Sequence, residues 1–185
     1  MSVFHTVGHS THEREAFLAL LRAHGIDVLV DVRRHPGSRR HPHFNRGEME
    51  AWLTEGGVAY RHQEELGGRR GPPDPESANG AWRSESFRAY ADHLGTGAGR
   101  AALDRLERAG RRRRAAVMCA EAVPWRCHRQ IVADHLVARG HEVRHILGRD
   151  RAEPHELRET ARVGEDGRVT YPARQTGLFD DEEGG

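Results

Sequence analysis

Both cysteines of this chain, Cys119 and Cys127, lie in one short stretch, MCAEAVPWRCHRQ, at residues 118–130. The same stretch contains Glu121 and His128. These residue types could support three kinds of chemistry. A cysteine activated by a histidine and a helix N-terminus is a nucleophile. Thiols and imidazoles together bind metal ions, and a carboxylate can activate water or stabilise an oxocarbenium-like centre.

The spacing of these residues favours the carboxylate chemistry. The histidines and cysteines show neither zinc-finger spacing nor an HExxH helix, so we predict no metal site and no cofactor. On a continuous helix that starts at Pro124, the side chains of Cys127 and His128 project about 100° apart, which places them poorly for pairing. Asp31 or Glu121 could instead act on a substrate whose phosphate is held by arginines. A thiol mechanism stays open as the alternative.

The hydrophobic pattern predicts which elements position these residues. Apolar runs predict five strands, at residues 4–10, 26–33, 58–63, 115–122 and 142–147. Helical spacing predicts helices between them, at residues 11–25, 48–57, 84–94, 98–109 and 124–140. Ser10 and Glu13 fit a capping box for the first helix, and Gly25 fits its end. Such alternation predicts a three-layer α/β fold, Rossmann-like, with a mainly parallel five-stranded sheet and helices on both faces.

Polar residues follow the predicted strands, while the strand interiors are apolar. Because ligands of parallel sheets bind outside the carboxyl ends of the strands, we expect one site there. The residues predicted to be catalytic are Asp31, Cys119, Glu121 and His128. The residues predicted to bind the substrate or its phosphate are His9, Ser10, Arg33, Ser38, Phe44, Tyr60, His62, Trp125, Arg126, Cys127 and Arg129.

Several of these residues also have a purely structural explanation. Ser10 could serve only as a helix cap, and Asp31 could be neutralised by Arg33 inside the fold. Cys127 could pack in the core, since it precedes Ile131 by one helical turn. The four arginines at residues 111–114 are better explained as a solvated turn than as a binding patch.

Composition limits the class of protein. The 29 basic residues are all arginine, the formal net charge is +1, and an acidic cluster in the tail offsets part of the positive charge elsewhere. This balance is compatible with a nucleic-acid partner without requiring one. No apolar run is long enough for a membrane span, and the first residues do not resemble a secretion signal, so we expect a cytoplasmic protein without a membrane partner.

Four motifs of the sequence resemble one known family. They are TVGHS, DVRRHPGSRR with the later PHF, YRHQEELGG and MCAEAVPWRCHR, in that order. The sequence is similar over residues 3–147 to the family called domain of unknown function 488. The resemblance implies a compact α/β domain, here residues 1–149, and leaves the reaction open. Residues 150–185 are then an appendage with a flexible tail.

The tail contains a second resemblance. Gln175, Leu178 and Phe179 are spaced like the peptide by which bacterial polymerases and repair proteins dock on the sliding clamp, burying an apolar pair in a pocket. Together with an arginine-lined site, this predicts an enzyme acting on DNA. Our first expectation is a DNA glycosylase that excises a flipped base. A hydrolase or transferase of free nucleotides or nucleosides, and a non-catalytic nucleic-acid-binding module, are the alternatives.

Overall fold

A six-stranded sheet forms the centre of the protein. The computed structural model describes residues 1–173 of the chain. The strands are β1 (Val3–Gly8), β2 (Val28–Asp31), β3 (Ala59–His62), β4 (Ala115–Cys119), β5 (Glu142–Gly148) and β6 (Arg151–Pro154). Their order is β3-β2-β4-β1-β5-β6, with the first five parallel and β6 antiparallel to β5. The predicted α/β fold with five parallel strands is confirmed, and β6 adds a sixth strand that was not predicted.

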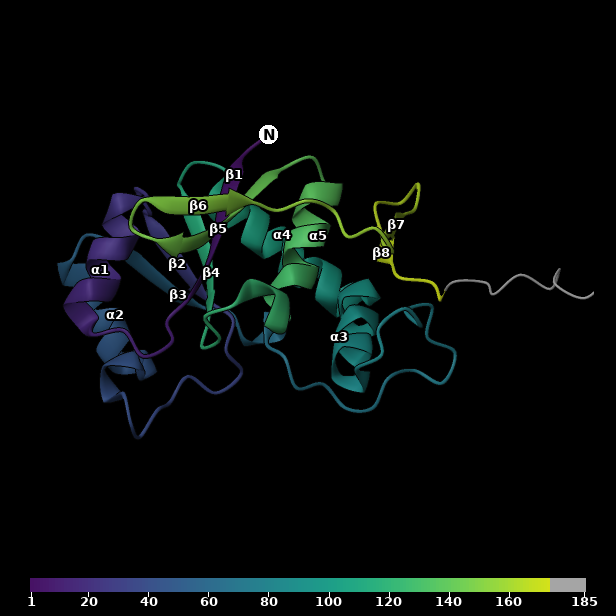
Figure 1. Cartoon of the computed structure of the whole chain (residues 1–185), viewed down its shortest axis with the longest axis horizontal. Helices are drawn as coiled ribbons and strands as arrows, with labels where there is room; N and C mark the ends of the chain where they lie inside the picture. The colour runs from purple at the N-terminus through teal and green to yellow at the C-terminus, as the bar shows by residue number, and fades with distance from the viewer. Residues whose placement is uncertain (174–185) are drawn as a thin grey trace, which may run out of the picture.

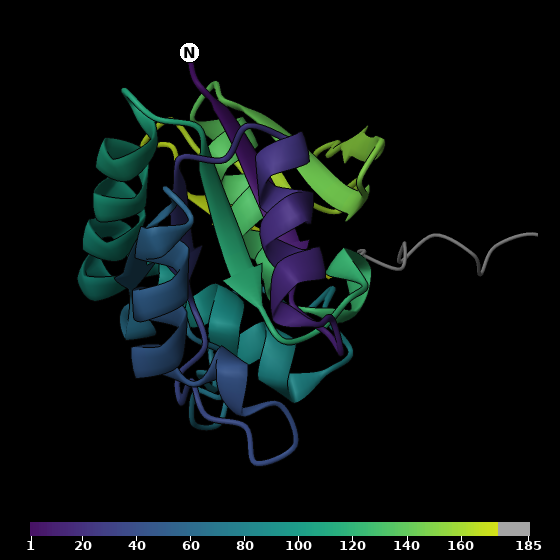
Figure 2. The same cartoon turned by 90° about the vertical axis from the view of Figure 1, so that its left-hand side faces the viewer.

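Helices cover both faces of this sheet. The helices are α1 (Arg14–Ala23), α2 (Arg46–Glu55), α3 (Glu85–Gly95), α4 (Gly97–Gly110) and α5 (Arg129–Ala138). In Figure 1, α1 and α2 lie on one side of the sheet and α3, α4 and α5 on the other. Figure 2 views the molecule from the side of α1 and α2, which lie in front of the strands. None of the helices in residues 1–173 is long and apolar enough to cross a bilayer.

The central strands β2 and β4 are buried on both faces, as a sheet enclosed by helices requires. All four residues of β2 are buried, and alternate residues enter different cores. Leu29 packs in a cluster with apolar residues of α1 and α2. Val28 and Val30 pack in the other cluster with residues of α3, α4 and α5. This period-two division is why a continuous apolar run folded here as a strand between two layers.

The strand order opens a crevice at the carboxyl end of β4. The chain moves from β1 through β2 to β3 in one direction and then returns through β4 to β5, so β4 lies between β1 and β2. The helices that follow β1 and β2 lie on one face, whereas α5, which follows β4, lies on the other. Loops that leave adjacent strands toward opposite faces separate from each other, which leaves room for a ligand.

The turn between β1 and α1 differs from the prediction. α1 begins at Arg14, and Glu13 precedes it without a side-chain capping bond, so the predicted capping box is wrong. Ser10 instead has a positive φ of 45°, and its backbone N–H donates to the carbonyl of Ala120. The chain turns there because the loop after β1 continues to pair with the loop after β4. Gly25 does end the helix, with a φ of 62°, as predicted.

Residues 150–173 pack against the rest of the fold. β6 extends the sheet beside β5, and a short hairpin follows, formed by β7 (Arg162–Val163) and β8 (Val169–Thr170). Tyr171 is fully buried, and its hydroxyl donates to the carboxylate of Asp134 on α5 at 2.7 Å. The backbone N–H of Tyr171 donates to the side chain of Asn79. This segment therefore covers part of the face formed by α3 and α5.

Candidate functional site

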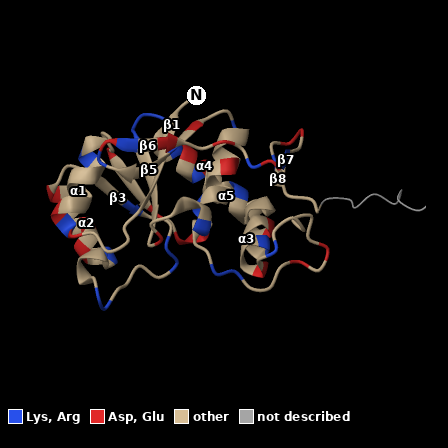
Figure 3. Cartoon of the chain, viewed as in Figure 1, with Lys and Arg blue, Asp and Glu red and all other residues tan. Residues whose placement is uncertain are grey.

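A pocket of about 780 Å³ lies at the carboxyl ends of β1, β2 and β4. Its lining comes from the loops after these strands, from the loop after β3, and from α3. The lining residues are His9, Arg33, Arg34, His35, Gly37, Ser38, Gly68, Arg69, Ser86, Phe87, Tyr90, Cys119, Ala120, Glu121, Arg126, Cys127 and His128. In Figure 3 several arginine segments lie on the loops at the lower edge of the view, where the strands end. The predicted position of a site at this edge thus coincides with a pocket.

The two cysteines meet at this pocket. Cys119 ends β4, and Cys127 follows a short 3-10 turn, η3 (Pro124–Arg126). Their sulfur atoms lie 2.7 Å apart, and both side chains are buried. The Sγ of Cys127 also lies 3.6 Å from Nδ1 of His128 and accepts the backbone N–H of Arg129 at 3.5 Å. Cys127 is therefore surrounded by groups that can donate hydrogen bonds to a thiolate.

These contacts separate the acidities of the two thiols. The hydrogen bond from Cys119, followed by the hydrogen bond and charge of His128, lowers the pKa of Cys127 to about 3 despite its burial. The same hydrogen bond, together with burial, raises the pKa of Cys119 well above its ordinary value. The negative charge of the pair therefore resides on Cys127, with Cys119 as the proton donor. A buried thiolate at the start of a helix is a nucleophile.

The expectation that Cys127 and His128 are poorly placed to pair is wrong. α5 begins at Arg129 rather than at Pro124, because η3 ends at Arg126 and Cys127 is extended, with φ −126° and ψ 149°. The 100° separation of neighbouring side chains on a helix therefore does not apply to these two residues. The break turns the sulfur of Cys127 back toward both Cys119 and His128.

His128 is held in place by two residues from other elements. The ring of Tyr90 on α3 contacts its imidazole edge-to-face, with centroids 4.8 Å apart. Gly68 leaves the room that the imidazole occupies, since a Cβ there would lie 2.9 Å from Nδ1. The Nε2 atom of His128 is buried and has no hydrogen-bond partner within residues 1–173. A buried ring nitrogen without a hydrogen-bond partner is unusual, and a catalytic role is one explanation for it.

Asp31 lies in a closed network instead of lining the pocket. It is fully buried and accepts hydrogen bonds from Nε and NH2 of Arg33 and from the hydroxyl of Tyr60. Arg33 also donates to the carbonyl of Phe44 and lies 3.2 Å from Nε2 of His9. A carboxylate so fully bonded is held by its partners, which matches the structural explanation given above. Burial, then the charge of Asp31, raises the pKa of Tyr60 far above its ordinary value.

The network reaches the pocket through Arg33 and His9. The imidazole of His9 stacks on the ring of Phe44, with centroids 4.1 Å apart, and it lines the pocket. Burial, followed by the charge of Arg33, lowers the pKa of His9 to about 4. His9 is therefore neutral at pH 7. It presents an uncharged ring to the pocket rather than an anion-binding cation.

The side chain of Arg129 points into the interior of the fold. It is almost fully buried, and its guanidinium donates to the backbone carbonyls of Glu121 and Ala122. These bonds hold the loop between β4 and η3 in place, so Arg129 positions that loop and is not directed at a substrate. The carboxylate of Glu121 is exposed, lines the pocket and accepts the N–H of Val123.

Eight of the fifteen predicted site residues line the pocket. They are His9, Arg33, Ser38, Cys119, Glu121, Arg126, Cys127 and His128. Seven do not line it, namely Ser10, Asp31, Phe44, Tyr60, His62, Trp125 and Arg129. Of these seven, His62 lies 2.7 Å from the carbonyl of Arg33, and Trp125 is 63% exposed beside Arg126.

The structure also adds lining residues that the pattern did not indicate. Phe87 and Tyr90 lie on the apolar face of α3, which packs in the core. They reach the pocket because α3 crosses the carboxyl end of the sheet. The hydroxyl of Tyr90 donates to the carbonyl of Leu66, a contact that no local pattern indicates. Arg34 and Arg69 line the pocket as well, and Arg34 donates to the carbonyl of Arg69.

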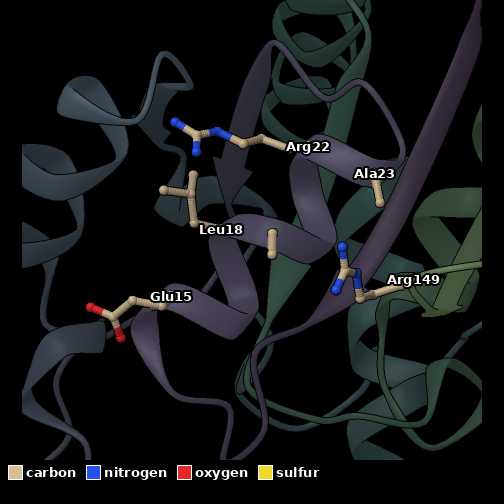
Figure 4. Close-up of a pocket in the computed structure, with 6 residues that line it drawn as sticks. Glu15, Leu18, Arg22, Ala23 and Arg149 are labelled. Atoms are coloured by element: carbon tan, nitrogen blue, oxygen red, sulfur yellow. The ribbon is translucent and has the colours of Figure 1, made fainter.

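Other parts of the molecule offer less chemistry. Within residues 1–173, no group of three or more histidine, cysteine or carboxylate side chains is arranged to hold a metal ion. A second hollow of about 450 Å³ lies along α1 (Figure 4), lined by Glu15, Leu18, Ala19, Arg22, Ala23 and Arg149. Arg22 there donates to the carbonyl of Gly56, and the lining contains no thiol or histidine. The pocket at the strand ends is therefore the candidate site.

Comparison with known proteins places the chain in a family. A family model described as domain of unknown function DUF488 matches residues 13–136, about two thirds of the chain. This span contains both cysteines, His128 and Arg129, while His9 and Ser10 lie just before it. No curated protein and no solved structure matches the chain. The chain belongs to the family defined by the domain of unknown function DUF488.

Proposed function

We propose that this protein is an enzyme that hydrolyses a phosphate ester of a nucleotide or of a nucleic-acid end, with the thiolate of Cys127 as nucleophile. One observation carries the proposal. Cys127 lies at an arginine-lined pocket with its sulfur hydrogen-bonded to Cys119, near Nδ1 of His128 and at the N-terminus of α5. These contacts favour the charged form of the thiol at neutral pH.

The charge of the pocket favours an anionic substrate. Arg34, Arg69 and Arg126 line it, and Glu121 is the single acidic residue of the lining. Arginine binds phosphate through two parallel hydrogen bonds, which makes it the better side chain for this ligand. A volume of about 780 Å³ is within the range of sites that enclose a small organic ligand. A nucleotide, or the terminal nucleotide of a strand, satisfies both conditions.

The chemical step follows from the positions of the groups. The Cys127 thiolate attacks the phosphorus, so that an S–P bond forms while the bond from phosphorus to the ester oxygen breaks. The leaving oxygen takes a proton from His128, whose Nε2 is unpartnered within residues 1–173. Water, deprotonated by the then neutral imidazole, hydrolyses the S–P bond. Inorganic phosphate leaves, and the thiolate and the protonated histidine are restored.

Base excision from DNA, the function expected first from the sequence, is the second candidate. Two observations favour it: the carboxylate of Glu121 is exposed at the pocket, and Trp125 presents an aromatic face to solvent next to Arg126. A carboxylate could activate water at the glycosidic carbon, and an exposed aromatic ring could stack on a base. Asp31, the other predicted carboxylate, is occupied by Arg33 and contributes structure.

One set of variants separates the two candidates. Cys127→Ser should abolish release of inorganic phosphate from nucleoside monophosphates and phosphorylated oligonucleotides while phosphate binding persists. His128→Asn should slow release by about 10²–10⁴-fold. Glu121→Gln should leave phosphate release nearly unchanged but abolish base release from lesion-bearing duplexes if the second candidate is correct. Thr54→Ala, an exposed position on α2 outside the pocket, is the matched control.

The outcomes can also reject both enzymes. If Cys127→Ser and Glu121→Gln alter only the affinity for an oligonucleotide and no product forms with the wild type, the protein is a binding module, as the non-catalytic alternative states. A rapid acid quench of wild-type protein with ³²P-labelled substrate should trap label on Cys127. Label on another residue would contradict the nucleophile assigned here.

Recruitment to the sliding clamp is a separate proposal. Gln175, Leu178 and Phe179 lie outside the described residues, so it is supported only by their spacing in the sequence. Deleting residues 175–179 should abolish capture of the protein by an immobilised clamp. Retained capture would contradict this part of the proposal and leave the enzyme proposals untouched.

A further inference from the structure

The two thiols at the pocket form a pair that the proposed hydrolysis does not need. Cys127 alone would serve as nucleophile, yet Cys119 lies with its sulfur 2.7 Å away, and both residues line the pocket. They are the only two cysteines of the chain. We propose that the pair is an oxidation site, at which a hydroperoxide that enters the pocket converts Cys119 and Cys127 into an intramolecular disulfide that stops the reaction.

Cys127 is the thiol that meets the hydroperoxide. The thiolate is the form that attacks an O–O bond, and the contacts to Cys119 and His128 place the negative charge on Cys127. Its sulfur attacks one peroxide oxygen, the O–O bond breaks, and the alcohol or water that leaves takes up a proton. The sulfur has been oxidised to a sulfenic acid, and the hydroperoxide has been reduced.

Cys119 then completes the reaction. Its sulfur attacks the sulfur of the sulfenic acid, an S–S bond forms, and hydroxide leaves and takes the proton of the Cys119 thiol to become water. In sum, two thiols and one hydroperoxide give one disulfide, one alcohol and one water. No further reactant is required for oxidation, and a small dithiol reverses it.

The geometry allows this bond with little movement. A disulfide holds its sulfurs about 2.05 Å apart, so the pair must close by roughly 0.7 Å. The two cysteines lie at the two ends of the loop between β4 and α5. In that loop, the guanidinium of Arg129 donates a hydrogen bond to the carbonyl of Glu121. The backbone of the loop is thereby kept in the position that presents the two sulfurs to each other.

The disulfide would remove both the nucleophile and the negative charge from the pocket. Loss of activity on oxidation rests on the proposed function, because it requires Cys127 to be the nucleophile. Formation of the disulfide rests only on the contact between the sulfurs. The two statements therefore fail in different ways, and one experiment can separate them.

The test is mass spectrometry of reduced protein treated with hydrogen peroxide. The wild type should lose two hydrogen atoms per chain, migrate as a monomer on a non-reducing gel, and regain both thiols with dithiothreitol. Cys119→Ser should stop at a sulfenic acid on Cys127 that dimedone traps. Cys127→Ser should stay unmodified over the same time. Circular dichroism of each variant confirms that the isosteric change left the fold intact.

Three results would overturn the inference. The first is a wild type that keeps both thiols, at a peroxide concentration that does modify Cys127 in the Cys119→Ser variant. The second is a disulfide found only between chains. The third is a sulfenic acid that persists in the wild type. A disulfide that forms without loss of phosphate release would support the oxidation site and contradict Cys127 as nucleophile. Loss of activity in Cys127→Ser, together with a wild type that forms no disulfide under peroxide, would do the reverse.

Discussion

The reactivity of Cys127 should be nearly independent of pH between 8.5 and 5.5. An ordinary thiol has a pKa near 8.5, so its thiolate fraction falls from about one half to about one in a thousand over this range, roughly 500-fold. Cys119 and His128 hold the pKa of Cys127 at about 3. Its thiolate fraction therefore stays close to one, and the rate of alkylation should change by less than about twofold.

The assay is alkylation by a small reagent such as iodoacetamide under pseudo-first-order conditions, with the modified peptide quantified by mass spectrometry. Cys127→Ser is the internal control, because it leaves only Cys119, whose pKa burial still raises once the hydrogen bond to Cys127 is gone. That variant should react slowly at every pH and lose about tenfold in rate per pH unit. A wild type that shows the same tenfold loss per unit would refute the assignment of the charge to Cys127.

The contribution of Cys119 can be measured by extending the same alkylation profile down to about pH 3, because only there does a cysteine with a pKa of about 3 lose its thiolate. A hydrogen bond to a charged acceptor contributes about 1.5–3 kcal/mol, which corresponds to a pKa change of about one to two units. Cys119→Ala should therefore raise the pKa of Cys127 by about that amount, whereas Cys119→Ser, which keeps a donor, should raise it less. Equal profiles for the Ala and Ser variants would mean that the hydrogen bond does not set the acidity of Cys127.

Three further predictions concern the groups around the site. Gly68→Ala places a Cβ 2.9 Å from the imidazole of His128, so it should raise the pKa of the reactive cysteine and move the acid limb of its alkylation profile to higher pH, while Gly71→Ala, with nothing within 4 Å, should not. Gly8→Ala places a Cβ 2.0 Å from a backbone oxygen of the loop after β4, and should lower the free energy of unfolding by about 1–3 kcal/mol or more. Gly47→Ala, in open space on α2, is its control in a urea titration. Acid should destabilise the fold because burial, the first cause in each case, lowers the pKa of several histidines from 6.5 to about 4. These are His5, His9, His135 and His145. Between pH 6.5 and 4 the unfolded chain binds protons that the native state does not. The free energy of unfolding therefore decreases as the pH is lowered, by about 2 kcal/mol per histidine at pH 5. An unfolding midpoint in urea that is unchanged between pH 7 and pH 5 would contradict this reasoning.

Local patterns in the sequence were enough to predict the layers of the fold and the edge at which the site lies. The near-continuous apolar run around Val28 and Val30 indicated a strand buried on both faces, and Gly25 indicated the end of α1 because glycine readily adopts a positive φ. These signals are local, since each depends on a few neighbouring residues. A parallel sheet then brings the residues that follow its strands to one edge, whatever the loops do.

The role of each polar residue at that edge depends on contacts between distant parts of the chain. Asp31 and Arg33 neutralise each other, and Arg129 turns inward to hold the loop after β4. Cys127 faces Cys119 and His128 because the chain breaks at η3, a feature that the helical pattern of the following residues concealed. Gly68 and Tyr90, which lie far away along the chain, set the position of His128. The direction of a side chain at a break depends on such distant contacts, so no local pattern can predict it.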